Sequence, residues 1–166
     1  MTLGVSLSTF TLVHVVLSLV GIFSGLIVVF GLLSGKRLEG WTALFLVTTV
    51  ATSVTGFGFP FHGFLPPHYV GIVSLVVLVV AIIARYPMRL AGAWRWIYVM
   101  TAMIALYFNV FVGVVQAFQK VPALRAIAPH QNEPPFVAAQ LVVLLLFVVL
   151  AVMAEKRFRI APLHAA

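Results

Sequence analysis

The feature of this sequence that most constrains its fold is a series of long apolar runs separated by short polar breaks. A helix that crosses a lipid bilayer needs roughly 20 predominantly apolar residues. Five segments fit this requirement and predict transmembrane helices at about residues 10–33, 41–59, 70–86, 96–118 and 136–154. We therefore expect residues 1–166 to form one all-α domain, an integral membrane helical bundle.

The composition agrees with a membrane protein, because 63% of the residues are hydrophobic and only 8% are charged. A soluble domain usually carries about 25% charged residues. A net charge of +7 is also found in nucleic-acid-binding proteins, but here the lysines and arginines lie in short clusters between the apolar runs. We expect the lipid bilayer, and no nucleic acid, as partner. The chain has no cysteine, which excludes disulfides and thiolate chemistry.

The connections differ in length and content. The first apolar run lacks a basic segment before it and is longer than the core of a cleavable signal peptide, so we expect it to be retained. The third run is the shortest and follows an uncharged loop, so a re-entrant hairpin is an alternative to a full crossing. The fourth connection, residues 119–135, is expected outside the bilayer, with a short helix over residues 122–128 that starts at Pro122.

The placement of basic residues predicts the orientation. Loops one and three and the tail lie on one side of the predicted bundle, and they hold eight of the ten lysine and arginine residues: Lys36, Arg37, Arg85, Arg89, Arg95, Lys156, Arg157 and Arg159. Loops rich in these residues stay in the cytoplasm. We therefore expect the N-terminus outside and the C-terminus in the cytoplasm.

Small and weakly polar residues recur at helical spacing and predict where the helices pack. Such residues let membrane helices approach closely. The first run has Gly21 and Gly25 in a G-x-x-x-G spacing, preceded by His14 and Ser18. The corresponding stripes on the second and fourth runs are Thr48, Thr52 and Thr55, and Thr101, Ala105, Asn109 and Gly113. We expect these stripes to face protein; a dimer contact through Gly21 and Gly25 is the alternative.

The pattern of ionisable residues argues against most membrane chemistry. None of the three acidic residues, Glu39, Glu133 and Glu155, lies inside a predicted span. Proton pumps, ion-coupled transporters and carboxylate enzymes rely on such groups. The sequence also lacks a nucleophile elbow, a zinc-protease motif and a phosphate-binding loop. The sequence therefore offers no catalytic residue, and we favour a protein that is not an enzyme.

Histidines and amides are the remaining groups that could bind a ligand, and most of them fall in the predicted outer half. His14 and His68 are the pair that would ligate haem b. A quinone headgroup held by His14, Asn109 or Gln140 is a related hypothesis. A metal site would draw on His14, His62, His68 and His130. The alternative for each of these residues is an ordinary hydrogen bond to a neighbouring helix or a solvated turn.

Four segments also carry a resemblance that covers nearly the whole chain: GKRLEGWTALFL at 35–46, TGFGFPF at 55–61, LAGAWRWIY at 90–98 and NVFVGVVQAFQKVP at 109–122. Together they resemble a family of small bacterial polytopic inner-membrane proteins without an assigned activity. The resemblance implies a multi-pass protein of the bacterial inner membrane, with cytoplasm inside and periplasm outside. It implies no functional residue.

These observations predict a non-enzymatic accessory or structural component of a membrane assembly, which packs with copies of itself or with a larger complex. The alternative is a redox or ligand-binding module with haem b, quinone or a metal at a periplasm-facing histidine site. A small-solute transporter is a further alternative, and it would need a polar path across the bilayer.

Overall fold

The computed structural model describes residues 6–59 and 66–158 of the 166-residue chain. Within these ranges every regular element is a helix and no strand occurs. The helices are α1 (Leu7–Leu33), α2 (Glu39–Gly56), α3 (Pro66–Arg85), α4 (Ala93–Lys120), α5 (Pro122–Ile127) and α6 (Pro134–Arg157). The prediction of an all-α helical bundle is confirmed.

Local sequence explains where the helices begin and end. Ser6 caps α1, because its side-chain oxygen accepts a hydrogen bond from the Thr9 N–H at 3.2 Å. Pro122 starts the short helix α5, as predicted, since a helix tolerates proline in its first turn. The second predicted segment ran to residue 59, but α2 ends at Gly56. The N–H groups of Phe57 and Gly58 bond to the carbonyls three residues earlier, and this tighter turn closes the helix.

Four helices of the described chain are long and apolar enough to cross a membrane: α1, residues 68–85 of α3, α4 and α6. Their outer faces carry large apolar side chains, such as Phe23, Phe30 and Leu145, which are 63%, 68% and 64% exposed. These surfaces suit contact with lipid, and the chain is a multi-pass membrane protein. Helix α2 is not one of the four. It has 18 residues and a length of about 27 Å, and it includes Glu39, Ser53 and several threonines.

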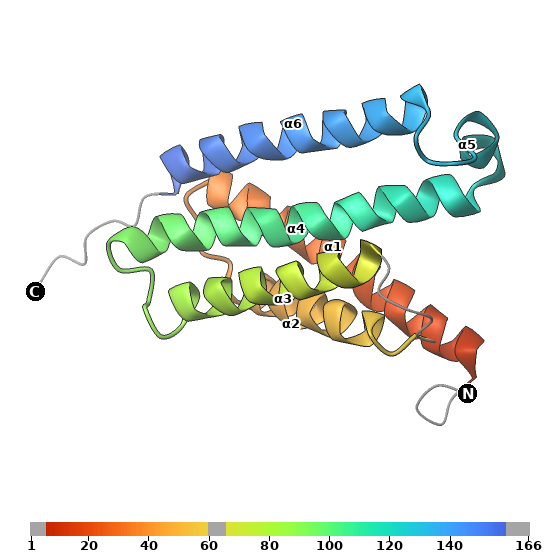
Figure 1. The fold of residues 1–166 in the computed structure, drawn as a ribbon. Coiled ribbons are helices and arrows are strands. Elements are labelled where there is room, and N and C mark those ends of the chain that lie inside the picture. The colour runs from red at the N-terminus through yellow and green to blue at the C-terminus, as the bar shows by residue number, and fades with distance from the viewer. Residues whose placement is uncertain (1–5, 60–65, 159–166) are drawn as a thin grey trace, which may run out of the picture.

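The helices alternate in direction (Figure 1). Helices α1, α3 and α6 run one way, and α2 and α4 run the other way. Helix α4 packs against α1, α3, α5 and α6 and is the central element of the bundle. We call the end where α1, α3 and α6 finish the basic end, because seven of the nine described lysines and arginines lie there: Lys36, Arg37, Arg85, Arg89, Arg95, Lys156 and Arg157. The opposite end, with His14, His68, His130 and α5, is the histidine end.

The core follows the period of α4. Tyr98, Ala102, Ala105 and Asn109 lie three or four residues apart on one face of this helix, with Leu106 beside Ala105, and all five are at most 7% exposed. Leu78 from α3 and Phe45 from α2 pack into the same core. By contrast, α6 contributes only three buried residues, Phe147, Ala151 and Ala154, so most of its surface faces outward.

Candidate functional site: the polar seam of the bundle

A hydrogen-bonded pair joins α1 to α4 inside the bundle. The Ser18 hydroxyl donates to Oδ1 of Asn109 at 2.9 Å, and Nδ2 of Asn109 lies 3.5 Å from the Ser18 carbonyl oxygen. Asn109 is only 7% exposed, so its amide would be costly to bury without these partners. The pair therefore links two helices, and each residue belongs to a stripe that was expected to face protein, Ser18 on the first run and Asn109 on the fourth.

The two glycines of the G-x-x-x-G spacing lie at the closest approach of α1 to its neighbours. A Cβ atom added at Gly21 would lie 2.9 Å from Nδ2 of Asn109 and 3.2 Å from Oγ1 of Thr49. A Cβ atom at Gly25 would lie 2.5 Å from Cδ1 of Leu106 and 2.9 Å from the ring of Phe45. Both glycines are buried within the chain. The spacing therefore serves packing inside one molecule, and the alternative of a dimer contact through it is not supported.

The threonine stripe of α2 is mostly satisfied by its own helix. The hydroxyls of Thr48, Thr52 and Thr55 donate to the carbonyl oxygens of Leu44, Thr48 and Ala51 at 2.7, 2.8 and 2.7 Å. The sequence stripe did not include Thr49, which is 2% exposed and lies against Gly21. Its hydroxyl has no hydrogen-bond partner among the described residues. Thr49 follows Thr48 directly, so a stripe that starts at Thr48 and continues at Thr52 and Thr55 passes over it.

Two further predicted packing residues lie on α4, and they differ in how closely they are packed. Ala105 is completely buried. A Cβ atom at Gly113 would meet only the side chain of Ile22 from α1, at 3.5 Å, which is an ordinary contact. The predicted stripe on α4 therefore faces protein, and it is tight at Ala105 and loose at Gly113.

His14 joins α1 to the last turn of α2. Its Nδ1 lies 2.8 Å from Oγ1 of Thr55, and its ring packs edge-on against Phe59, with a centroid distance of 5.2 Å. The Thr55 hydroxyl hydrogen is already donated to the Ala51 carbonyl, so Thr55 must accept from His14. A neutral His14 then carries its proton on Nδ1 and leaves a lone pair on Nε2. Nε2 has no hydrogen-bond partner among the described residues.

His68, the predicted haem partner of His14, lies against another face of the same helix end. Its ring packs on Phe57, with a centroid distance of 6.0 Å. Thr55 and Phe57 are two residues apart in helical geometry and therefore point about 200° apart around the axis. His14 contacts the Thr55 side and His68 the Phe57 side. These contacts give no support to the predicted pair of axial ligands.

The other predicted ligands are also held by local contacts. In the described ranges no three His, Asp or Glu side chains come together. His130 donates its backbone N–H to Oε1 of Glu133 at 3.0 Å, and His62 lies outside the described residues. In the predicted quinone set, Nε2 of Gln140 donates to the Phe111 carbonyl at 3.2 Å and so joins α6 to α4. Its Oε1 is buried with no partner in the described chain.

At the basic end, a buried arginine connects three helices, and the sequence analysis did not predict this contact. The Arg85 side chain is 2% exposed and lies 2.8 Å from Oε2 of Glu39. Nη2 also donates to the Arg37 carbonyl at 2.9 Å, and the guanidinium carbon lies 5.1 Å from the centroid of the Tyr98 ring. Arginine on an aromatic face is a favourable cation–π arrangement. The signal was that Glu39 is one of only three acidic residues in the chain.

A second arginine closes the end of α6. Nη1 of Arg95 donates to the Glu155 carbonyl at 3.1 Å and also to the Phe158 carbonyl. Its Nη2 lies 3.4 Å from Oε1 of Glu155. The last carbonyls of a helix lack partners within the helix, and a cation near them is favourable. Arg95 therefore fixes α6 to the start of α4.

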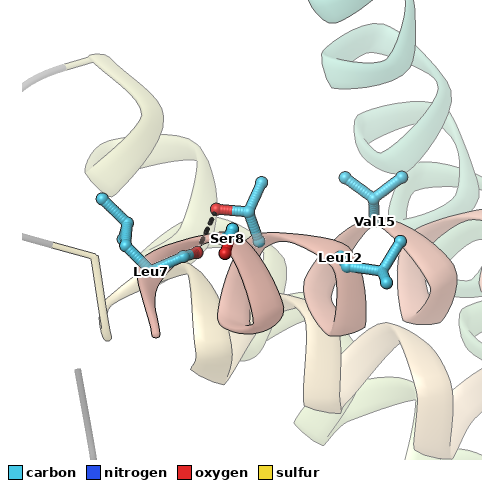
Figure 2. Close-up of a pocket in the computed structure, with 5 residues that line it drawn as sticks. Leu7, Ser8, Leu12 and Val15 are labelled. Atoms are coloured by element: carbon cyan, nitrogen blue, oxygen red, sulfur yellow. Dashed lines mark hydrogen bonds between the residues drawn. The ribbon is translucent and has the colours of Figure 1, made fainter. Parts of the chain in front are cut away.

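A hollow on the surface of α1 lies near the histidine end (Figure 2). Its volume is about 580 Å³, and Leu7, Ser8, Thr11, Leu12 and Val15 line it. The Thr11 hydroxyl donates to the Leu7 carbonyl at 2.8 Å, so it is already used within the helix. The remaining lining is mainly apolar and continuous with the exposed face of α1, as expected for a surface in contact with lipid.

The fold and this interior define a multi-pass α-helical membrane protein in which several polar side chains connect the helices. Comparisons of the chain with protein-family models, with curated proteins and with solved structures find no match.

Proposed function

We propose that this chain is a non-enzymatic component of a membrane assembly that packs with copies of itself or with a larger complex. One observation carries the proposal: several polar side chains within the bundle bind other helices of the same chain. Ser18 binds Asn109, His14 binds Thr55, and Ser53 binds Ser74 at 3.2 Å. Interhelical hydrogen bonds of this kind stabilise a bundle. The parts left for a partner are the outer surface, above all α6, and the two ends.

A co-purification experiment tests the proposal. Two copies of the full chain with different C-terminal tags are expressed together, and one tag is captured from membranes in mild detergent. Recovery of the second tag supports a homo-oligomer, and recovery of a defined protein in constant ratio supports a larger complex. Capture of a single copy alone in several mild detergents would overturn the proposal.

We also propose that all five long helices cross the membrane, with the N-terminus outside and the C-terminus in the cytoplasm. Two observations support this topology. Helix α2 lies alongside α1 and α3, and the charges concentrate at the basic end, which matches the distribution in cytoplasmic loops. Reporter fusions after Lys36, after Arg89 and at the C-terminus should all report a cytoplasmic location. A periplasmic signal at any of them would contradict the topology. The compartment we propose is the bacterial inner membrane, as the resemblance implies.

A second candidate function rests on His14. Its Nε2 lone pair can accept a proton-donating group, such as a quinol hydroxyl, or bind a metal ion or haem iron. The site would then be a ligand-binding module at the histidine end. Absorption spectra of the oxidised and reduced protein, metal analysis and lipid extraction on one sample test this candidate. A stoichiometric ligand lost in His14→Ala but kept in His130→Ala would favour it, and an unliganded wild-type protein would exclude it.

A further inference from the structure

The charges at the basic end are only partly neutralised within the chain. The two carboxylates there are already paired, Glu39 with Arg85 and Glu155 with Arg95. The side chains of Lys36, Arg37 and Arg157 are exposed, and among the described residues none has a carboxylate within ion-pair distance. These three residues therefore form a surface with uncompensated positive charge, which we call the basic rim.

The basic rim is assembled from segments far apart in the sequence. Lys36 and Arg37 follow the end of α1, and Arg157 is the last residue of α6. The two segments meet at Gly35, where an added Cβ atom would lie 3.7 Å from the Arg157 carbonyl oxygen. The Lys36 N–H donates to the Gly31 carbonyl at 2.8 Å, which fixes the turn after α1. The fold therefore places these cations beside one another.

An apolar surface lies next to the rim along both helices. Phe30 is one turn before the end of α1 and is 68% exposed; Val149 and Val152, near the end of α6, are 53% and 48% exposed. The rim thus offers positive charge at the end of the bundle and apolar contact along its sides. A phospholipid with a negatively charged headgroup has the complementary arrangement, because its phosphate adjoins its acyl chains.

We propose that the basic rim of Lys36, Arg37 and Arg157 binds the headgroup of an anionic phospholipid whose acyl chains lie along the exposed faces of α1 and α6. A zwitterionic lipid offers no net charge to neutralise the rim. A free phosphate lacks the apolar part that would contact Phe30 and Val152. This proposal does not depend on whether the protein acts in an assembly or binds a ligand at His14.

The test measures lipid retention by native mass spectrometry after purification in mild detergent with phosphatidylglycerol or phosphatidylcholine added. The wild-type protein should retain phosphatidylglycerol preferentially. Lys36→Gln with Arg157→Gln should lose this preference, with affinity falling about 30-fold for two charges near the membrane surface. The matched control, Lys120→Gln with Arg125→Gln, removes two exposed charges at the histidine end and should behave like the wild type.

A charge-preserving variant and a competition with inorganic phosphate complete the test. Lys36→Arg with Arg157→Lys preserves both charges and should retain the preference for phosphatidylglycerol. This variant also tests the proposal if the glutamine variant does not fold. Excess inorganic phosphate should not displace the lipid. Equal retention of the two lipids by the wild type, an equal loss in the histidine-end control, or displacement by inorganic phosphate would each overturn the proposal.

Discussion

At the scale of single residues, glycine decides how closely α1 approaches its neighbours. Gly25 faces Phe45 and Leu106, and both of these side chains are 1% exposed, so neither has free space into which it can move. Protein interiors are packed at near-crystalline density, and an added methyl group forces side chains or backbone to shift. Gly113 on α4 has no such restriction.

Gly25→Ala should therefore destabilise the bundle, whereas Gly113→Ala should not. We expect the free energy of unfolding in mixed micelles to fall by about 1–3 kcal/mol for Gly25→Ala. Gly113→Ala should gain up to about 1 kcal/mol from helix propensity. Both variants make the same chemical change in a membrane helix, so equal effects would contradict the packing described for α1.

The Ser18–Asn109 pair should show energetic coupling between α1 and α4. Each alanine substitution leaves the remaining polar group without its partner, and the double variant removes both groups. A double-mutant cycle with Ser18→Ala and Asn109→Ala should give a coupling energy of about 0.6–1.7 kcal/mol, the range typical of hydrogen bonds between membrane helices. Additive effects of the two substitutions would show that the pair does not stabilise the contact.

Glu133, before α6, should titrate at unusually low pH. Desolvation is the largest single influence and raises its pKa. The backbone N–H groups of His130, Glu133 and Asn132, together with the charge of His130, outweigh it and lower the pKa below the ordinary 4.5. The pKa of Glu133 is lower in the folded protein than in the unfolded chain. The hydrogen bonds to its carboxylate therefore contribute their full stability above the ordinary pKa, and this contribution is lost as the pH falls through the pKa of the folded protein. The amide proton shifts of His130 and Asn132 should titrate below pH 4.5. A midpoint at or above 4.5 would contradict these contacts, and Glu133→Gln should abolish the titration.

At the scale of elements, the sequence was sufficient for the helices and insufficient for their partners. Apolar runs and prolines located all five long helices, and Pro122 located α5, because length and helix-breaking residues are local properties. Within the predicted small-residue stripes, Gly21, Gly25, Ala105 and Asn109 are buried, and the other members on α1 and α4 are half-buried. The pairing of Ser18 with Asn109 and of Glu39 with Arg85 depends on how distant helices meet, which spacing alone does not determine.

The site predictions show the same limit at the histidine end. The sequence places His14 and His68 at matching depth, but depth does not specify the face of a neighbouring helix that each one contacts. The end of α2 separates them, with Thr55 bound to His14 and Phe57 packed on His68. Asn109 and Gln140, the predicted quinone ligands, both bind protein groups in the bundle, as in the alternative of an ordinary hydrogen bond to a neighbouring helix.

The Glu39–Arg85 ion pair should hold the start of α2 to the end of α3. Leu38, which precedes α2, provides no side-chain cap, so this end of the helix depends on other contacts. We expect Glu39→Gln to lower the free energy of unfolding by about 1–2 kcal/mol, because Arg85 stays buried while Glu39 is partly solvated. Glu155→Gln breaks a longer pair, and its arginine is 24% exposed and so can be solvated without the carboxylate; this change should cost less than about 1 kcal/mol. The reverse order would show that Arg85 does not depend on Glu39.

At the scale of the whole molecule, the bundle is centred on α4, and α6 is the helix least covered by the rest. In the most apolar 18-residue stretch of each helix, 17% of α6 is buried inside the bundle, against 39% of α1 and 39% of α4. Lipid can cover such a helix, and so can another membrane helix. The proposed role in an assembly therefore depends on what surrounds this chain in its own membrane.

The most direct test of that role is the mass of the particle that contains the protein, extracted from native membranes into polymer nanodiscs without detergent. One chain has a mass of 18.1 kDa. We predict a protein mass of two or more times this value, or one that includes a second polypeptide in fixed ratio. Particles that contain one 18.1 kDa chain and only lipid would contradict the account.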